Sequence, residues 1–297
     1  MRLLVLGGSG QLGTQLRTLA LVPGVELVAP DRSAVDLGDA AAIARLVAAE
    51  PWSAVINAAG YTNVDRAESE EDRAFAINAE AAANVASETG KRGMPVIYVS
   101  TDYVFDGSKG APYVETDAAA PLNAYGRSKL AGERLVAAAN PRHVILRTAW
   151  LFSAQGSNFV RTILRLAQER ERLTVVADQV GCPTAACDLA EACLAIALHC
   201  AADPDRAAYG TFHFAGAEAV TWFDFAKAIV AQARDRLSRL PDVVPTTTAQ
   251  YGNPTVRPAD SRLNCTAIGN AFGIKPPSWR LALAATVERL MAQARSP

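Results

Sequence analysis

The chain has 297 residues, of which 50% are apolar and 20% are charged, and its formal net charge is −1. This composition is typical of a globular protein with one large domain or two unequal ones. The near-neutral charge balance and the lack of an apolar run of membrane-spanning length argue against a nucleic-acid partner and a membrane partner.

An apolar run, Leu3 to Leu6, leads directly into a glycine turn, Gly7-Gly8-Ser9-Gly10-Gln11-Leu12-Gly13. A buried strand, a glycine turn and a helix in this order present a helix N-terminus to a pyrophosphate, because glycine allows the backbone to approach closely. The next apolar run, Val25 to Ala29, is followed by Asp31, where a carboxylate would accept hydrogen bonds from an adenosine ribose. These features favour dinucleotide binding over an ordinary tight turn.

Strand-like runs alternate with helical patterns through the first half of the chain. We expect strands at Leu3–Leu6, Val25–Ala29, Ala54–Asn57, Val96–Ser100 and Val144–Arg147, and helices at Gln11–Leu21, Ala40–Ala49 (with Asp39 as N-cap), Asp72–Gly90 and Ala124–Ala139. Such β–α alternation predicts a parallel, doubly wound sheet that is covered on both faces.

The alternation weakens after about residue 150. Further helices are expected at Phe159–Glu171, Asp188–Cys200, Phe223–Leu237 and Leu281–Ala294, with a proline-dotted loop from Pro241 to Pro258. We therefore predict an α/β fold with a Rossmann-type doubly wound parallel sheet in a dinucleotide-binding domain, residues 1–150, and a smaller C-terminal α/β substrate domain, residues 151–297. The apolar 188–200 helix is expected to return to the sheet.

The cysteines and histidines do not form a metal-type pattern. Five cysteines lack CxxC spacing and three histidines are scattered, so buried thiols in a reducing cytosol are the favoured interpretation. A strand that begins at residue 2 does not fit a signal peptide. We expect a cytoplasmic protein without a bound metal.

Two further signals concern chemistry. Tyr125 and Lys129 lie four residues apart at the start of an expected helix, hence on one face, and an adjacent ammonium would lower the pKa of the phenol and make it a proton donor. A Tyr/Lys pair of this spacing is also common on solvated helices. Thr101, however, ends a buried strand and would point into the same crevice. The three signals together favour hydride transfer to a carbonyl group.

Longer blocks of sequence carry a resemblance to a known family. The glycine turn, Ser100-Thr101-Asp102-Tyr103-Val104-Phe105 and Tyr125-x-x-x-Lys129 resemble the extended short-chain dehydrogenase/reductase superfamily. Blocks such as Arg147-Thr148-Ala149-Trp150, Asp178-Gln179-x-Gly181-x-Pro183-Thr184 and Arg257-Pro258-x-x-Ser261 resemble its nucleotide-sugar reductases, which act on the C4 ketone of dTDP-4-dehydro-β-L-rhamnose. The resemblance runs almost end to end.

The resemblance implies a role for each matching residue. The implied catalytic residues are Thr101, Tyr125 and Lys129; the implied cofactor-binding residues are Gly7, Gly10, Gln11, Leu12, Gly13, Asp31, Arg32, Asp36, Leu37, Ala59, Gly60, Tyr61, Tyr125 and Lys129; and the implied substrate-binding residues are Thr101, Asp102, Tyr103, Tyr125, Trp150 and Arg257. Tyr61 stands where some members have histidine, so the backbone beside Gly60 is expected to make that contact. Gln15 stands where an acidic metal ligand would be expected in some members.

Several alternatives stay open at this stage. Asp31 favours NADH while Arg32 favours NADPH, so use of both cofactors is expected. The sequence also allows another nucleotide-sugar reductase, a dehydratase or an epimerase, although Tyr103 replaces the second carboxylate of the dehydratases. A non-catalytic subunit, like the regulatory subunit of methionine adenosyltransferase, is a third interpretation. A homodimer is expected only because symmetric dimers are common.

Overall fold

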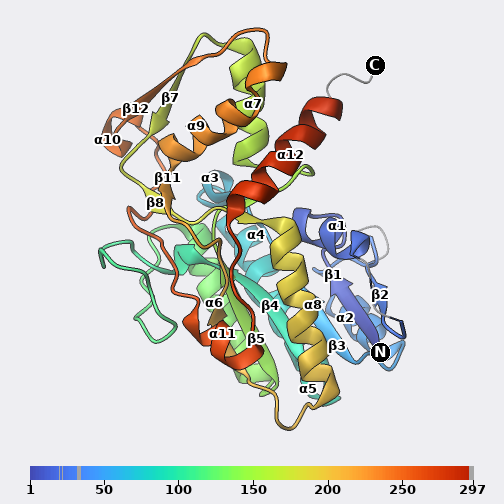
Figure 1. The fold of residues 1–297 in the computed structure, drawn as a ribbon. Coiled ribbons are helices and arrows are strands. Elements are labelled where there is room, and N and C mark those ends of the chain that lie inside the picture. The colour runs from blue at the N-terminus through green and yellow to red at the C-terminus, as the bar shows by residue number, and fades with distance from the viewer. Residues whose placement is uncertain (20, 22, 32–34, 294–297) are drawn as a thin grey trace.

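A six-stranded parallel sheet forms the centre of the molecule (Figure 1). The computed structural model describes residues 1–19, 21, 23–31 and 35–293. In spatial order, the strands of the sheet are β10 (Gly210–His213), β5 (His143–Thr148), β4 (Val96–Thr101), β3 (Ala54–Asn57), β1 (Arg2–Leu6) and β2 (Glu26–Val28). Strands β2 and β3 flank β1 on opposite sides, so the chain order reverses next to β1, where doubly wound sheets bind ligands.

The pleat of β1 explains why both faces of the sheet are covered. Leu3 and Val5 point to one face and pack with α1 (Gln11–Thr18), α8 (Ala186–Ala202) and α11 (Thr266–Phe272). Leu4 and Leu6 point to the other face and pack with α2 (Ala40–Ala48), α5 (Ala81–Gly90) and α6 (Ala124–Ala139). The predicted doubly wound fold is confirmed, and so is the Asp39 N-cap, which accepts from the amides of Ala41 and Ala42. The residues of the expected 188–200 helix lie in α8, which packs on the sheet.

A second hydrophobic cluster lies beyond the carboxyl ends of the strands, toward the top of Figure 1. Helices α7 (Phe159–Glu169), α9 (Trp222–Gln232) and α12 (Trp279–Gln293) pack there beside the parallel pair β7 (Arg172–Val176) and β12 (Asp242–Thr246). The short strand pairs are β6 (Leu151–Phe152) with β9 (Thr184–Ala185), and β8 (Val180–Gly181) with β11 (Val220–Thr221). Short helices lie at α3 (Val64–Ala67), α4 (Glu71–Phe75), α10 (Thr248–Tyr251), η2 (Asp102–Val104) and η3 (Arg234–Arg236).

The sheet and the helices differ from the sequence prediction at several points. Strand β10 was not predicted, and it joins the main sheet from beyond residue 150. Helix α1 ends at Thr18 because Leu19 is extended, and α9 ends at Gln232. Within the described residues, no helix has the length and apolar character needed to span a membrane.

The helix expected at Asp72–Gly90 is interrupted by a π-helical turn, η1 (Ala76–Glu80). At this turn the carbonyl oxygen of Asn78 accepts a hydrogen bond of 2.6 Å from the hydroxyl of Tyr98. The Asn78 side chain forms hydrogen bonds with the backbone of Tyr61 and with the hydroxyl of Ser128, on the helix α6 that carries Tyr125 and Lys129. The irregular turn is therefore bonded to α6 through Asn78 and Ser128. Such π-helical turns occur frequently near functional sites.

Candidate active site

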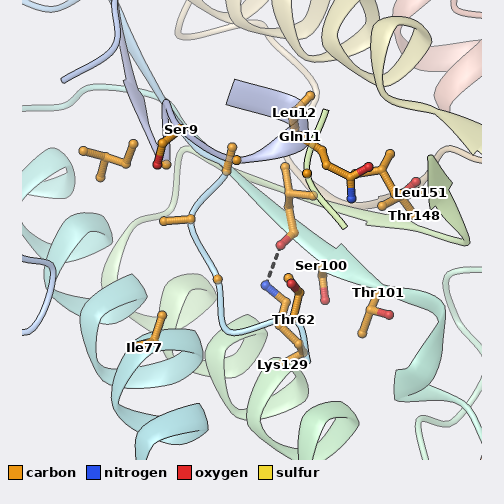
Figure 2. Close-up of a pocket in the computed structure, with 18 of the residues that line it drawn as sticks. Ser9, Gln11, Leu12, Thr62, Ile77, Ser100, Thr101, Lys129, Thr148 and Leu151 are labelled. Atoms are coloured by element: carbon orange, nitrogen blue, oxygen red, sulfur yellow. Dashed lines mark hydrogen bonds between the residues drawn. The ribbon is translucent and has the colours of Figure 1, made fainter. Parts of the chain in front are cut away.

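A cleft of about 720 Å³ lies at the carboxyl ends of β1, β3, β4 and β5. It brings together residues that are far apart in sequence, as Figure 2 shows for Gln11, Leu12, Thr101 and Lys129. The predicted site residues that line the cleft are Gly7, Gly10, Gln11, Leu12, Asp31, Asp36, Leu37, Ala59, Gly60, Thr101, Asp102, Tyr103, Tyr125, Lys129 and Trp150.

The glycine turn presents the first turn of α1 to this cleft. Gly10 is the N-cap residue and supplies no side-chain cap, so no side chain there accepts from the amides at the start of α1. A Cβ on Gly13 would lie 2.2 Å from the carbonyl oxygen of Gly7, which means that Gly13 lets the helix pack tightly on the turn. The donors and the positive end of the helix fit a pyrophosphate.

The segment that follows β2 lines the cleft beside the glycine turn. Asp31, Asp36 and Leu37 lie there, and Asp31 accepts a hydrogen bond of 2.7 Å from Arg17 of α1. The predicted phosphate contact Arg32 lies outside the described residues.

Helix α6 carries the Tyr/Lys pair in its first two turns. Asn123 caps the helix by accepting from the amide of Gly126, so the helix begins beside the cleft. The ammonium of Lys129 donates to the carbonyl oxygen of Val99 at 2.6 Å, the dashed contact in Figure 2. It also lies 4.0 Å from the centre of the Tyr98 ring. Lys129 is therefore held against β4, the strand that ends in Thr101.

Burial controls the protonation of both groups. It raises the pKa of Tyr125 to about 12, although a contact with Thr101 acts in the opposite direction. It lowers the pKa of Lys129 to about 7, against the attraction of Glu133. The sequence-based expectation that Lys129 lowers the pKa of the phenol is wrong, because burial raises this pKa and the group that opposes the rise is Thr101, not Lys129. Tyr125 consequently remains protonated at neutral pH.

The end of β4 places hydroxyl and carboxyl groups beside Tyr125. Thr101 accepts from the amide of Tyr103 and donates to Asp102 Oδ1 at 3.0 Å. Burial raises the pKa of Asp102 to about 7. Among the described residues, the buried side-chain atoms without a hydrogen-bond partner are Asp102 Oδ2 and Thr148 Oγ1, and both residues line the cleft. A buried polar atom without a hydrogen-bond partner costs about 1–3 kcal/mol. The cleft therefore fits a ligand that is rich in hydrogen-bonding groups.

An aromatic wall closes the cleft next to β5. Trp150 has a φ of 47°, and its indole stacks on that of Trp222 with centroids 3.4 Å apart. A Cβ on Gly181 would lie 2.3 Å from the Trp150 ring, so this glycine makes room for the indole. Trp222, in the first turn of α9, was not predicted, because an aromatic residue at a helix start has no signal that separates it from core packing.

A second cavity of about 560 Å³ adjoins the cleft and shares Val64, Tyr103, Phe159 and Trp222 with it. Arg257 lines this cavity rather than the cleft and forms an ion pair of 2.8 Å with Asp65 of α3. The hydroxyl of Tyr103 contacts Arg257, although burial raises the pKa of this tyrosine.

Besides Arg257, three residues singled out from the sequence lie away from the cleft lining. Gly13 packs beneath the glycine turn, and the hydroxyl of Tyr61 donates to Glu70 at 2.9 Å. The backbone of Tyr61 is bonded on both sides by Asn78. Gln15 donates to Gln155 at 2.8 Å. The described residues contain no group of three or more His, Cys, Asp or Glu residues arranged to hold a metal ion.

A polar clamp across the cleft was missed from the sequence. Gln11 Oε1 accepts hydrogen bonds from Ser153 at 3.0 Å and from Asn158 at 2.9 Å. The loop after β6 is thereby tied to the glycine turn, and its residues Gly156, Ser157 and Asn158 line the cleft. Short polar residues in a loop have no spacing that would have revealed this contact.

The parallel sheet with its glycine turn, strand-end threonine and Tyr/Lys helix defines a Rossmann-type protein of the extended short-chain dehydrogenase/reductase class. The family described as "RmlD substrate binding domain" matches residues 1–292, and the chain belongs to that family.

Curated relatives and solved structures are similar over nearly the whole chain. The dTDP-4-dehydrorhamnose reductase of Sinorhizobium fredii is 42% identical over 279 residues, which is 94% of this chain and 94% of the relative. The protein of the same name from Escherichia coli K12 is 40% identical over 291 residues, with 95% of each chain covered. The crystal structure of dTDP-4-dehydrorhamnose reductase from Bacillus anthracis in complex with NADP has a TM-score of 0.88 and 35% identity, and covers 96% of this chain and 98% of that one.

Proposed function

We propose that this chain is a dTDP-4-dehydrorhamnose reductase, which reduces the C4 ketone of dTDP-4-dehydro-β-L-rhamnose with NADPH or NADH. The relatives named above carry this activity in their names, and one of them is solved with NADP. The observation that carries the proposal is the convergence of Thr101, Tyr125 and Lys129 on the cleft below the glycine turn.

The reduced nicotinamide supplies a hydride to the ketone carbon when it is bound. Tyr125 donates its hydroxyl proton to the ketone oxygen, so the ketone becomes a secondary alcohol. Because burial keeps the pKa of Tyr125 near 12, the proton is present at neutral pH and is transferred only to a strongly basic oxygen such as a developing alkoxide. Thr101 orients the same oxygen from the end of β4.

Lys129 returns a proton to the Tyr125 phenol after each reduction. Its ammonium is held by Val99 at the floor of the cleft, and Gly60 lies close to it, because a Cβ there would be 3.9 Å from the Lys129 nitrogen. From this position the ammonium would also bond the hydroxyls of the nicotinamide ribose. A pKa near 7 lets Lys129 exchange a proton near neutral pH.

The nucleotide sugar is proposed to span the cleft and the adjoining cavity. Asp102, Tyr103 and Trp150 would contact the deoxysugar, with the indole face of Trp150 against its apolar side. Arg257 would pair with the diphosphate, since a guanidinium matches phosphate oxygens geometrically. In this proposal residues 1–150 form the dinucleotide-binding domain, with helix α8 packed on its sheet, and residues 151–297 form the substrate domain, which adds Arg257 to the substrate contacts.

We further propose that the protein works in the cytoplasm as a homodimer. All five cysteines are free, which suits a reducing compartment. Leu281 of α12 is 82% exposed, an apolar contact available to a second copy. Light scattering coupled to gel filtration measures the mass directly, and a monomer at assay concentration would contradict the dimer.

The decisive experiment follows NADPH oxidation with dTDP-4-dehydrorhamnose generated in situ from dTDP-glucose by the preceding enzymes. Product formation that depends on this chain supports the reductase. Stoichiometric NAD⁺ retained through purification, with interconversion of sugar epimers and no net oxidation of NADPH, would instead indicate an epimerase. Absent turnover together with tight binding to a partner enzyme would indicate a regulatory subunit.

A further inference from the structure

The cleft-facing carboxylate of Asp31 is already paired with a cation that the sequence did not single out. Arg17 lies in the last turn of α1, and its Nη2 donates to Asp31 Oδ1 at 2.7 Å and also to the carbonyl oxygen of Ala29. Strand β2 ends at Val28, so these two bonds hold the guanidinium over the segment that follows the strand.

Arg17 also lies against the glycine turn. A Cβ on Gly8 would lie 2.9 Å from Arg17 Nη2 and 3.1 Å from the Cβ of Ala29. Because Gly8 and Asp31 both line the cleft, the guanidinium stands at the cleft edge between the turn and the end of β2. A dinucleotide with its pyrophosphate on α1 would carry its adenosine ribose to this edge.

The two nicotinamide cofactors differ at this ribose. NADH has a 2′-hydroxyl, which can donate to a carboxylate, whereas NADPH has a 2′-phosphate with a charge of about −1.5 to −2. An unpaired Asp31 would repel that phosphate. A guanidinium neutralises the carboxylate and offers charge-assisted hydrogen bonds to phosphate oxygens. Arg17 contacts Oδ1, so Oδ2 is the Asp31 oxygen available to a ribose hydroxyl.

We propose that Arg17 is the specificity-determining residue that admits the 2′-phosphate of NADPH, while Asp31 serves the 2′-hydroxyl of NADH. This inference rests on the proposed function only in placing a nicotinamide dinucleotide in the cleft. The chain then accepts both cofactors because the acid and the base at the cleft edge are paired with each other.

Binding of cofactor fragments tests the proposal without catalysis. Isothermal titration calorimetry measures the Kd of 2′,5′-ADP, which carries the 2′-phosphate, and of ADP-ribose, which has the 2′-hydroxyl. In Arg17→Met we expect 2′,5′-ADP to bind about tenfold more weakly or worse, since a charge-assisted hydrogen bond is lost. ADP-ribose should stay within about twofold of its wild-type Kd. Arg17→Lys should recover part of the 2′,5′-ADP affinity because it keeps the charge.

Two further variants sharpen the result. Asp31→Asn should weaken the binding of ADP-ribose. It should leave the affinity for 2′,5′-ADP unchanged or increase it, because the carboxylate that repels the phosphate is gone. Arg45→Met is the matched control, an exposed helical arginine of α2 that pairs with Asp39 and does not line the cleft. It should bind both fragments like the wild type. Thermal melting of each variant identifies any loss of folding.

Three outcomes would overturn the proposal: equal weakening of both fragments in Arg17→Met, no weakening at all, or a selective loss of 2′,5′-ADP in Arg32→Met but not in Arg17→Met. The proposed function fails separately. Selective binding of 2′,5′-ADP through Arg17 without reduction of the nucleotide sugar would refute the reductase and keep the cofactor inference. Reduction of the nucleotide sugar together with an unchanged cofactor preference in Arg17→Met would refute the cofactor inference and keep the reductase.

Discussion

Glu133 and Arg147 form a bidentate ion pair in the interior, with Nε to Oε1 at 2.9 Å and Nη2 to Oε2 at 2.7 Å. Ser100 donates to the same carboxylate at 2.5 Å. The pair therefore joins α6, β4 and β5, the elements that carry Tyr125 and Thr101. Glu133 also lies one turn beyond Lys129 on α6, which places a buried carboxylate directly beneath the Tyr/Lys pair.

Loss of one charge from this pair should destabilise the fold. Glu133→Gln leaves the Arg147 charge buried and uncompensated, and removing one partner of a buried pair costs about 3–5 kcal/mol. Urea unfolding measures the change in the free energy of unfolding. The double variant Glu133→Leu/Arg147→Met should be less destabilised than Glu133→Gln, because neither charge is then buried. A double variant that unfolds more readily than the single one would show that the pair itself stabilises the core.

The phenol proton should be needed for chemistry and not for cofactor binding. Tyr125→Phe keeps the ring but removes the general acid, which typically contributes about 10²–10⁴ in rate. We expect kcat to fall by at least that order, while the Kd of NADPH from fluorescence titration changes little. Full activity in Tyr125→Phe would remove this residue from the mechanism.

Lys129 should give the stability of the protein a distinct pH dependence. Its folded pKa of about 7 lies below the ordinary lysine pKa of 10.5, so the unfolded chain binds more protons between these two values. By linkage, this group raises the free energy of unfolding as pH rises from about 7 to about 10.5, because burial of a charged lysine is no longer required.

Lys129→Met removes this dependence. The Tm of the variant relative to that of the wild type should be highest near pH 6, where the wild type must bury a charged group. The relative Tm should be lowest near pH 10. Thermal melts of both proteins across that range measure the difference in Tm. An offset that is the same at pH 6 and pH 10 would mean that Lys129 does not titrate with a lowered pKa in the folded protein.

The sequence predicted the sheet well because its strands are buried on both faces and read as continuous apolar runs. Ala54–Asn57 and helix Ala124–Ala139 match the structure at both ends. Strand β10 was missed, since Gly210–His213 is a short edge strand whose pairing with β5 depends on tertiary contacts. The π-turn at Ala76–Glu80 was missed for the same reason, because its hydrogen bond is with Tyr98, which is distant in sequence, and no local pattern indicates it.

The site shows the same division between local and tertiary information. Glycine spacing, the Tyr/Lys interval and the strand-end threonine are local patterns, and the residues that they predict line one cleft. The direction of the Tyr125 pKa was missed, because desolvation depends on everything packed around the phenol. Arg17 and Trp222 were missed because their partners, Asp31 and Trp150, become neighbours only through the fold.

Arg257 should act on the substrate and not on the cofactor. In Arg257→Met the proposed diphosphate contact is lost, and a hydrogen bond to a charged group is worth about 1.5–3 kcal/mol. We expect KM for the nucleotide sugar and the inhibition constant of dTDP to rise about tenfold or more, with KM for NADPH unchanged. Arg165→Met, on the exposed face of α7, is the control. Equal effects on both substrates would place Arg257 in a purely structural role with Asp65.

Gly181 should matter because of Trp150. Gly181→Ala introduces a Cβ that would lie 2.3 Å from the Trp150 indole, too close for any real contact, so the ring must leave its stack with Trp222. Trp150 also holds a φ of 47°, a conformation that a bulky residue keeps only when its surroundings enforce it. Displacement of the ring should raise KM for the nucleotide sugar and change tryptophan fluorescence, while 2′,5′-ADP binds as before. Gly269→Ala is a useful comparison, since neither glycine has a positive φ and a Cβ on Gly269 would make only an ordinary contact, 3.4 Å from the carbonyl oxygen of Ile274. If Gly181→Ala alters neither fluorescence nor KM, the indole wall does not position the sugar.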